Sequence, residues 1–113
     1  YDVQRFKVAA GERVKLVLNN PDQMPHNLLI IRPGTVERVG AAADAMLSDP
    51  RAQGRSFIPA SPDILFATEL VGPDQSITLR FTVPEKPGEY PYVCTFPGHW
   101  RIMRGVMVVE AAN

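Results

Sequence analysis

Residues 90–105 of the chain read YPYVCTFPGHWRIMRG, and the prediction of the fold starts from this stretch. It contains the only cysteine, Cys94, followed by His99 and Met103 in the spacing Cys-x4-His-x3-Met. The residues on either side read as strands, which places the three side chains on one loop between two strands. Because a proline and a glycine between Cys94 and His99 permit a tight reversal of the chain, one short loop can direct all three donors toward one point.

The donors on this loop are a thiol, an imidazole and a thioether, a set that favours copper over hard, oxygen-loving cations. The only other histidine, His26, lies far upstream and completes a group of two imidazoles and one thiolate. Such a plane with a weak axial thioether suits both oxidation states of a type 1 copper centre, whose chemistry is single-electron transfer. The sequence therefore predicts one type 1 copper per chain, with His26, Cys94 and His99 in the plane and Met103 as the axial ligand.

The neighbours of these four residues are expected to shape the site. Asn27 directly follows His26, and its amide is expected to hydrogen-bond to the backbone around Thr95, which would hold the two ligand loops together. An apolar surround would raise the reduction potential, because it disfavours the extra charge of Cu(II). The side chains expected to provide this surround are Met24, Pro25, Phe96, Pro97 and Ile102.

Trp100, directly after His99, leaves two interpretations open. In the first, Trp100 belongs to an apolar surface on which transient redox partners dock near His99. The other members of that surface are Met24, Pro25 and Pro97. In the second, its indole packs against Arg101, Arg104 or a neighbouring domain.

The rest of the chain alternates between short strand-like segments and turn signals. The expected strands are 3–8, 13–18, 26–31, 64–71, 76–83, 89–94 and 105–110, with at most one more short strand at 56–58. An alanine-rich segment at about 36–47 carries its apolar residues on one helical face and predicts a short helical flap over the sheets. These apolar residues are Val36, Val39, Ala43, Met46 and Leu47. Seven or eight strands with one helix predict an all-β, Greek-key β-sandwich in which residues 1–113 form a single domain.

Composition limits the partners and the location. Twelve basic and twelve acidic side chains cancel, and no charged run indicates binding to nucleic acid or to a membrane surface. The longest unbroken aliphatic run, Leu28 to Ile31, is too short to span a bilayer, and no signal-peptide pattern starts at Tyr1. We therefore expect a mature or excised domain with any export signal already removed. Its expected location is the periplasm or the outside of the cell, and a membrane tether is left open.

The sequence YVCTFPGH at residues 92–99, followed by Met103 and Gly105, resembles the C-terminal ligand loop of azurins and auracyanins. These are blue copper proteins of the cupredoxin fold. The resemblance covers nearly the whole chain, since an asparagine pair before His26, the His26–Asn27 pair, a helical flap and the last strand follow in the same order. It implies the cupredoxin fold and the same four copper ligands.

Two features depart from azurins. Azurins have a glycine just before the first histidine ligand, and the carbonyl of this glycine approaches the metal. This chain has Pro25 at that position, as plastocyanins have a proline, so we expect a four-coordinate site. Azurins also have a disulfide near the N-terminus, which a chain whose only cysteine is Cys94 cannot form.

Two alternatives to a diffusible electron carrier remain open at this point, and a third is disfavoured. The domain could relay electrons inside a larger membrane or multidomain oxidoreductase, which changes its context and leaves its site unchanged. Copper storage or delivery would need exposed, exchangeable ligands. A hydrolase with Cys94 as nucleophile and His99 as base lacks an evident orienting group and gives Met103 no role, so we expect no enzyme activity.

Overall fold

The computed structural model describes residue 1 and residues 3–112. The described chain contains seven strands, one α-helix and two short 3-10 helices. Their bounds are β1 (Arg5–Ala9), β2 (Arg13–Asn20), β3 (Leu29–Ile31), α1 (Val36–Ala45), η1 (Met46–Ser48), η2 (Gln53–Arg55), β4 (Ile64–Ala67), β5 (Gln75–Thr82), β6 (Gly88–Val93) and β7 (Arg104–Glu110). The predicted all-β class with one short helix is confirmed.

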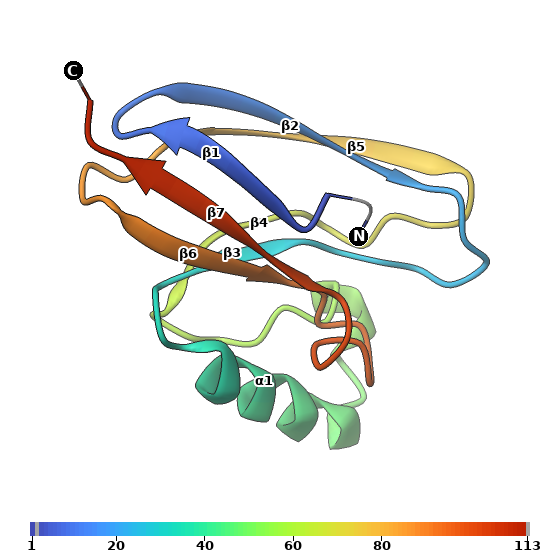
Figure 1. Cartoon of the computed structure of the whole chain (residues 1–113). Helices are drawn as coiled ribbons and strands as arrows, with labels where there is room; N and C mark the ends of the chain where they lie inside the picture. Colours follow the sequence, from blue (N-terminus) through green and yellow to red (C-terminus); the bar gives the residue numbers. More distant parts are fainter. Residues whose placement is uncertain (2, 113) are drawn as a thin grey trace.

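The strands form two sheets that face each other (Figure 1). The larger sheet has the order β1-β7-β6-β3-β4, and the smaller one pairs β2 with β5. β1 and β7 run parallel although they lie at opposite ends of the chain, and the other pairs are antiparallel. The chain leaves the larger sheet for the smaller one twice, at β2 and at β5, and such crossings between two sheets are typical of the expected sandwich.

The main core fills the space between the sheets. On β5 the alternating residues Ile77, Leu79 and Phe81 are less exposed than their neighbours, and they belong to or pack against this core. From the larger sheet, Tyr92 and Met107 enter the same core with exposed fractions of 2% and 0%. This period of two is the pattern from which the strands were predicted.

A second core lies between the larger sheet and α1, which covers the outer face of that sheet (Figure 1). Leu29 and Ile31 point into it, whereas Ile30 between them belongs to the main core. β3 is therefore buried on both faces, which explains its unbroken aliphatic sequence. From α1, Val39 and Ala43 pack against this face of β3.

The predicted helix at about 36–47 is confirmed, but the α-helix ends earlier than predicted. α1 ends at Ala45, and the chain tightens into the 3-10 turn η1. A 3-10 turn has three residues per turn, so it rotates later side chains off the buried face, and Leu47 is 59% exposed. The optional strand at 56–58 is absent, because Ser56 and Phe57 have φ angles of 55° and 56° in the left-handed region.

Candidate metal centre

Three predicted ligands meet at one end of the sandwich. The candidate ligand atoms of His26, Cys94 and His99 all lie within 4.8 Å of one another. Cys94 Sγ is 3.6 Å from Nδ1 of His99 and 4.0 Å from Nδ1 of His26. Cys94 and His26 are buried, with exposed fractions of 0% and 6%, whereas His99 is partly exposed.

The sheet explains why residues 68 positions apart meet. Cys94 directly follows β6, and His26 lies just before β3, which is the neighbour of β6 through the pairing of Leu29 with Val93. His26 is held there by an isolated bridge, in which its N–H donates to the carbonyl of Val71 at 3.1 Å and its carbonyl accepts the Val71 N–H at 2.7 Å. Two neighbouring strand ends thus fix both residues.

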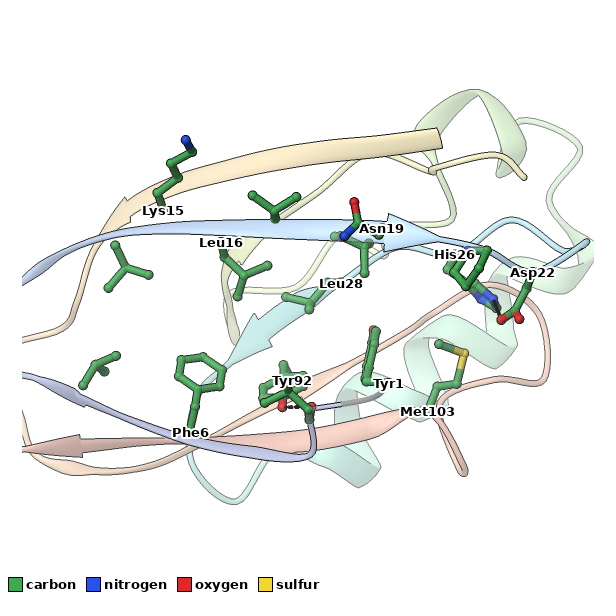
Figure 2. A pocket seen from close by; sticks show the side chains of 16 residues that line it. Tyr1, Phe6, Lys15, Leu16, Asn19, Asp22, His26, Leu28, Tyr92 and Met103 are labelled. Carbon is green, nitrogen blue, oxygen red and sulfur yellow. Dashed lines mark hydrogen bonds and ion pairs between the residues drawn. The ribbon is translucent and has the colours of Figure 1, made fainter. Parts of the chain in front are cut away.

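The loop after Cys94 folds as a helical turn. The N–H groups of Ile102 and Met103 both donate to the carbonyl of His99, at 3.1 and 2.7 Å. The N–H of Cys94 donates to the carbonyl of Met103 at 3.0 Å, which closes the loop. The side chain of Met103 lines the same cavity of about 510 Å³ as His26 and lies near it (Figure 2). The spacing Cys-x4-His-x3-Met is therefore realised as one compact turn beside the cluster.

The distances within the cluster fit a trigonal metal site. Bonds of about 2.0 Å to nitrogen and about 2.3 Å to sulfur, the values for a first-row ion such as zinc, put nitrogen and sulfur about 3.7 Å apart at 120°. The observed separations of 3.6 and 4.0 Å bracket this value. One thiolate and two imidazoles are also the plane that type 1 copper prefers, so the residues present fit that ion.

The hydrogen bond expected between Asn27 and Thr95 is present. The Thr95 N–H donates to Asn27 Oδ1 at 2.7 Å, and Asn27 Nδ2 donates to Thr95 Oγ1 at 2.9 Å and to the Ser56 carbonyl at 2.8 Å. Thr95 Oγ1 donates in turn to the Phe57 carbonyl at 2.7 Å. Asn27 and Thr95 are 0% and 2% exposed, so this network joins three segments through buried, direct hydrogen bonds.

Burial sets the charge of the cluster before any ion binds. Burial raises the pKa of the Cys94 thiol and lowers the pKa of His99. The neighbouring His26 lowers the pKa of His99 further. A buried thiol and a neutral imidazole are the forms expected at neutral pH. Metal binding at Cys94 must therefore release a proton, since the thiolate is the ligand form.

Trp100 does not lie on a docking surface, so the first interpretation of this residue is wrong. Its side chain is 4% exposed and packs in the second core, beneath α1. The indole Nε1–H donates to Asp44 Oδ1 at 3.1 Å, and the guanidinium carbon of Arg101 lies 4.3 Å from the centre of the ring. The second interpretation, packing against Arg101, agrees with the structure.

The apolar surround differs from the expectation in two residues, Ile102 and Met24. Ile102 is 80% exposed and faces solvent, because the helical turn carries it to the outside of the loop. Phe96 is partly buried, and its ring centre is 4.9 Å from that of His99. Pro25 and Pro97 are also partly buried, and Met24 is 48% exposed. Met24 and Ile102 are thus surface residues near the site.

Two residues at the site were not anticipated. Asp22 Oδ2 lies 2.8 Å from His26 Nε2, and its position four residues before His26 is a signal that the sequence offered. The Tyr1 hydroxyl donates to the carbonyl of Asn27 at 2.6 Å. No local pattern could indicate this contact, because it joins residues 26 positions apart through the tertiary fold.

Comparisons with known proteins agree on one group. The family model described as copper binding proteins, plastocyanin/azurin family, matches residues 1–110. Auracyanin-A of Chloroflexus aurantiacus is 30% identical over 97% of this chain and 67% of its own length. An azurin of Achromobacter denitrificans is 31% identical over 74% of this chain and 55% of its own. The chain thus spans between about half and two thirds of the length of these relatives.

A solved structure extends the similarity to three dimensions. The crystal structure of dithionite-reduced auracyanin from Roseiflexus castenholzii superposes with a TM-score of 0.83 at 33% identity. The match covers 97% of this chain and 86% of that one. Because the match covers nearly all of the described chain, both sheets and the segments that carry the cluster fall within it.

Proposed function

This chain belongs to the plastocyanin/azurin family of copper-binding proteins, and from that premise we propose that residues 1–113 form a single cupredoxin domain in which His26, Cys94, His99 and Met103 hold one type 1 copper. Copper as the cofactor is confirmed by the family. The relatives are electron carriers rather than enzymes, in agreement with the expectation that this chain is a carrier. When bound, copper supplies a one-electron couple between its cuprous and cupric states.

The observation that carries the proposal is the convergence of Cys94, His26 and His99, of which the first two are buried. Fast electron transfer needs ligands that hardly move between the two oxidation states. Here Asn27 joins the two ligand loops, and the Cys94 N–H is bonded to the Met103 carbonyl. These contacts fix the donors in advance, and the 0% exposure of Cys94 keeps water from the sulfur.

We place partner docking around His99, the partly exposed member of the cluster. Met24 and Ile102, which are 48% and 80% exposed, supply apolar surface nearby. Redox complexes are commonly small, below about 1,200 Å² of buried surface, which suits short encounters. Since the chain has a formal net charge of zero, we expect electron transfer to depend only mildly on ionic strength.

A location outside the cytoplasm, in the periplasm or beyond the cell, is supported by the azurin and auracyanin relatives. No helix in the described part of the chain is both long and apolar enough to cross a membrane. The second candidate context is an electron-relay domain in a larger oxidoreductase, in which the same four residues would hold the copper. Sequencing the complete reading frame on both sides of residues 1–113 distinguishes the two contexts.

Copper titration followed by optical spectroscopy tests the proposal. One equivalent of Cu(II) is expected to give the intense visible band of a thiolate–Cu(II) bond, and Cys94→Ser is expected to abolish it. The matched control is Met107→Leu, which removes a sulfur from the main core and should leave the band intact. A wild-type protein that binds copper without this band would overturn the assignment. Rapid loss of copper to a chelator would instead indicate storage or delivery.

A further inference from the structure

The two nitrogens of the His26 ring face different groups. Nε2 lies 2.8 Å from Asp22 Oδ2, as the dashed line in Figure 2 marks. Nδ1, on the other side of the ring, lies 4.0 Å from Cys94 Sγ and so faces the cluster. His26 is 6% exposed, whereas the Asp22 side chain is 64% exposed. One side of a buried ring therefore meets a carboxylate that reaches in from the surface.

This arrangement selects one form of the neutral imidazole. An ionised carboxylate only accepts hydrogen bonds, so the ring nitrogen that faces Asp22 must carry the hydrogen. The lone pair then remains on Nδ1, the nitrogen that faces Cys94. The hydrogen bond made by one ring nitrogen thus decides which nitrogen is free to bind a metal.

The loop that carries Asp22 is itself held by a buried amide. Asn20, at the end of β2 and 2% exposed, accepts the Asp22 N–H on Oδ1 at 2.9 Å. Its Nδ2 donates to the carbonyls of Met24 and Val71, both at 2.8 Å. Val71 is also the residue that bridges the backbone of His26. Asn20 therefore fixes the carboxylate and the ring relative to the same backbone, so the contact does not depend on an exposed ion pair alone.

We propose that Asp22 is a positioning residue that keeps His26 in the Nε2–H form, with Nδ1 aimed at the cluster, and that its negative charge favours the cupric over the cuprous state. The inference rests on the proposed function, in which His26 is a ligand. A carboxylate on the outer nitrogen makes an imidazole a stronger donor, and a stronger donor favours the higher metal charge. Loss of Asp22 should weaken Cu(II) binding and raise the reduction potential.

Two substitutions separate the hydrogen bond from the charge. Asp22→Asn keeps an acceptor oxygen for Nε2–H and removes the charge, whereas Asp22→Leu removes both. Gln23→Ala, an exposed change in the same loop, is the matched control. Because residues 22 and 23 are exposed, all three variants should fold, which circular dichroism verifies.

The first measurement needs no copper. Nitrogen-15 NMR of the histidine rings in mildly alkaline buffer should show His26 protonated on Nε2 in the wild type, in Asp22→Asn and in Gln23→Ala. Asp22→Leu should show a mixture of the two tautomers. A pure Nε2–H form in Asp22→Leu would overturn the positioning role, whatever the protein binds.

The second measurement combines two titrations. Competition with a chelator gives the affinities for Cu(II) and Cu(I), and a redox titration gives the reduction potential. Changes in the residues behind a metal ligand typically cost 10–100-fold in metal affinity, and we expect a loss in this range for Cu(II) in Asp22→Leu. For Asp22→Asn we expect the preference for Cu(I) over Cu(II) to rise by about threefold to tenfold, where tenfold corresponds to about 59 mV for one electron. Wild-type affinities and potential in both variants would refute the inference. A wild-type protein without type 1 copper would refute the proposed function instead.

Discussion

The indole ring of Trp100 occupies the space that a side chain on Gly40 would need. A Cβ built on Gly40 would lie 2.4 Å from Cδ2 and Cε2 of the ring, closer than such atoms approach in proteins. On the same helix, Asp44 accepts hydrogen bonds from Trp100 Nε1 and from Arg101, both at 3.1 Å. Helix α1 therefore holds the residues that directly follow His99.

Gly40→Ala is expected to destabilise the protein although alanine is the better helix former. Overpacking against the ring costs about 1–3 kcal/mol, and the gain of about 1 kcal/mol in helix propensity offsets part of it. We expect the free energy of unfolding to fall by about 1–2 kcal/mol in urea denaturation. Gly54→Ala is the control, since nothing lies within 4 Å of its added Cβ. Equal stability of the two variants would show that the Trp100 ring moves aside freely.

The sequence predicted what local patterns determine. The alternation along β5 and the spacing Cys-x4-His-x3-Met both reflect the geometry of single elements, and the structure has the strand and the compact turn. The family resemblance rested on the same loop. The pairing of Asn27 with Thr95 was also foreseen, because each residue adjoins a predicted ligand.

Residues placed by the tertiary fold were predicted less well. Whether Trp100 faces solvent or a helix depends on the absence of a side chain at Gly40, 60 positions away, and no local pattern reports that. The prediction that Ile102 is part of the apolar surround was wrong, because the turn carries its side chain outward. The end of α1 depended on a change from α to 3-10 geometry, which helix propensity does not resolve.

Asn27→Ala is expected to weaken both the fold and the metal centre. The substitution leaves the buried N–H of Thr95 without its acceptor at 2.7 Å, and an unsatisfied buried group costs about 1–3 kcal/mol of unfolding free energy. Because the two ligand loops lose their link, copper affinity should also fall by about 10-fold or more, measured by chelator competition. Gln53→Ala, at an exposed position, should change stability by less than about 0.5 kcal/mol. A stable Asn27→Ala variant with wild-type affinity would contradict the role of the network.

Acid should weaken the ion pair between Asp63 and Arg38, which helps to attach α1 to the rest of the protein. Arg38 on α1 donates to both carboxylate oxygens, at 2.6 and 3.0 Å, and these bonds lower the pKa of Asp63. A carboxyl whose pKa is lower in the folded than in the unfolded state contributes stability above about pH 4. That stability is lost as the pH falls through the lower, folded value. Urea denaturation between about pH 6 and pH 2 should therefore show an acid-dependent loss that is smaller in Asp63→Asn.

Glu69→Gln is the matched control for this measurement, because Glu69 is an exposed acid that makes no ion pair in the described structure. Its acid-dependent loss of stability should equal that of the wild type. If Asp63→Asn also kept the full wild-type loss, the acid sensitivity would arise elsewhere in the fold.

Met103→Leu tests the axial position. Leucine conserves the volume of methionine closely enough for the loop to keep its fold, while the thioether is lost. A thioether donates electron density that favours Cu(II), so its removal should raise the reduction potential and leave one equivalent of copper bound. Met107→Leu makes the same chemical change at a residue of β7 that is 0% exposed in the main core, and its potential should stay at the wild-type value. An unchanged or lower potential in Met103→Leu would contradict the axial assignment, because the sulfur would then not favour Cu(II) over Cu(I).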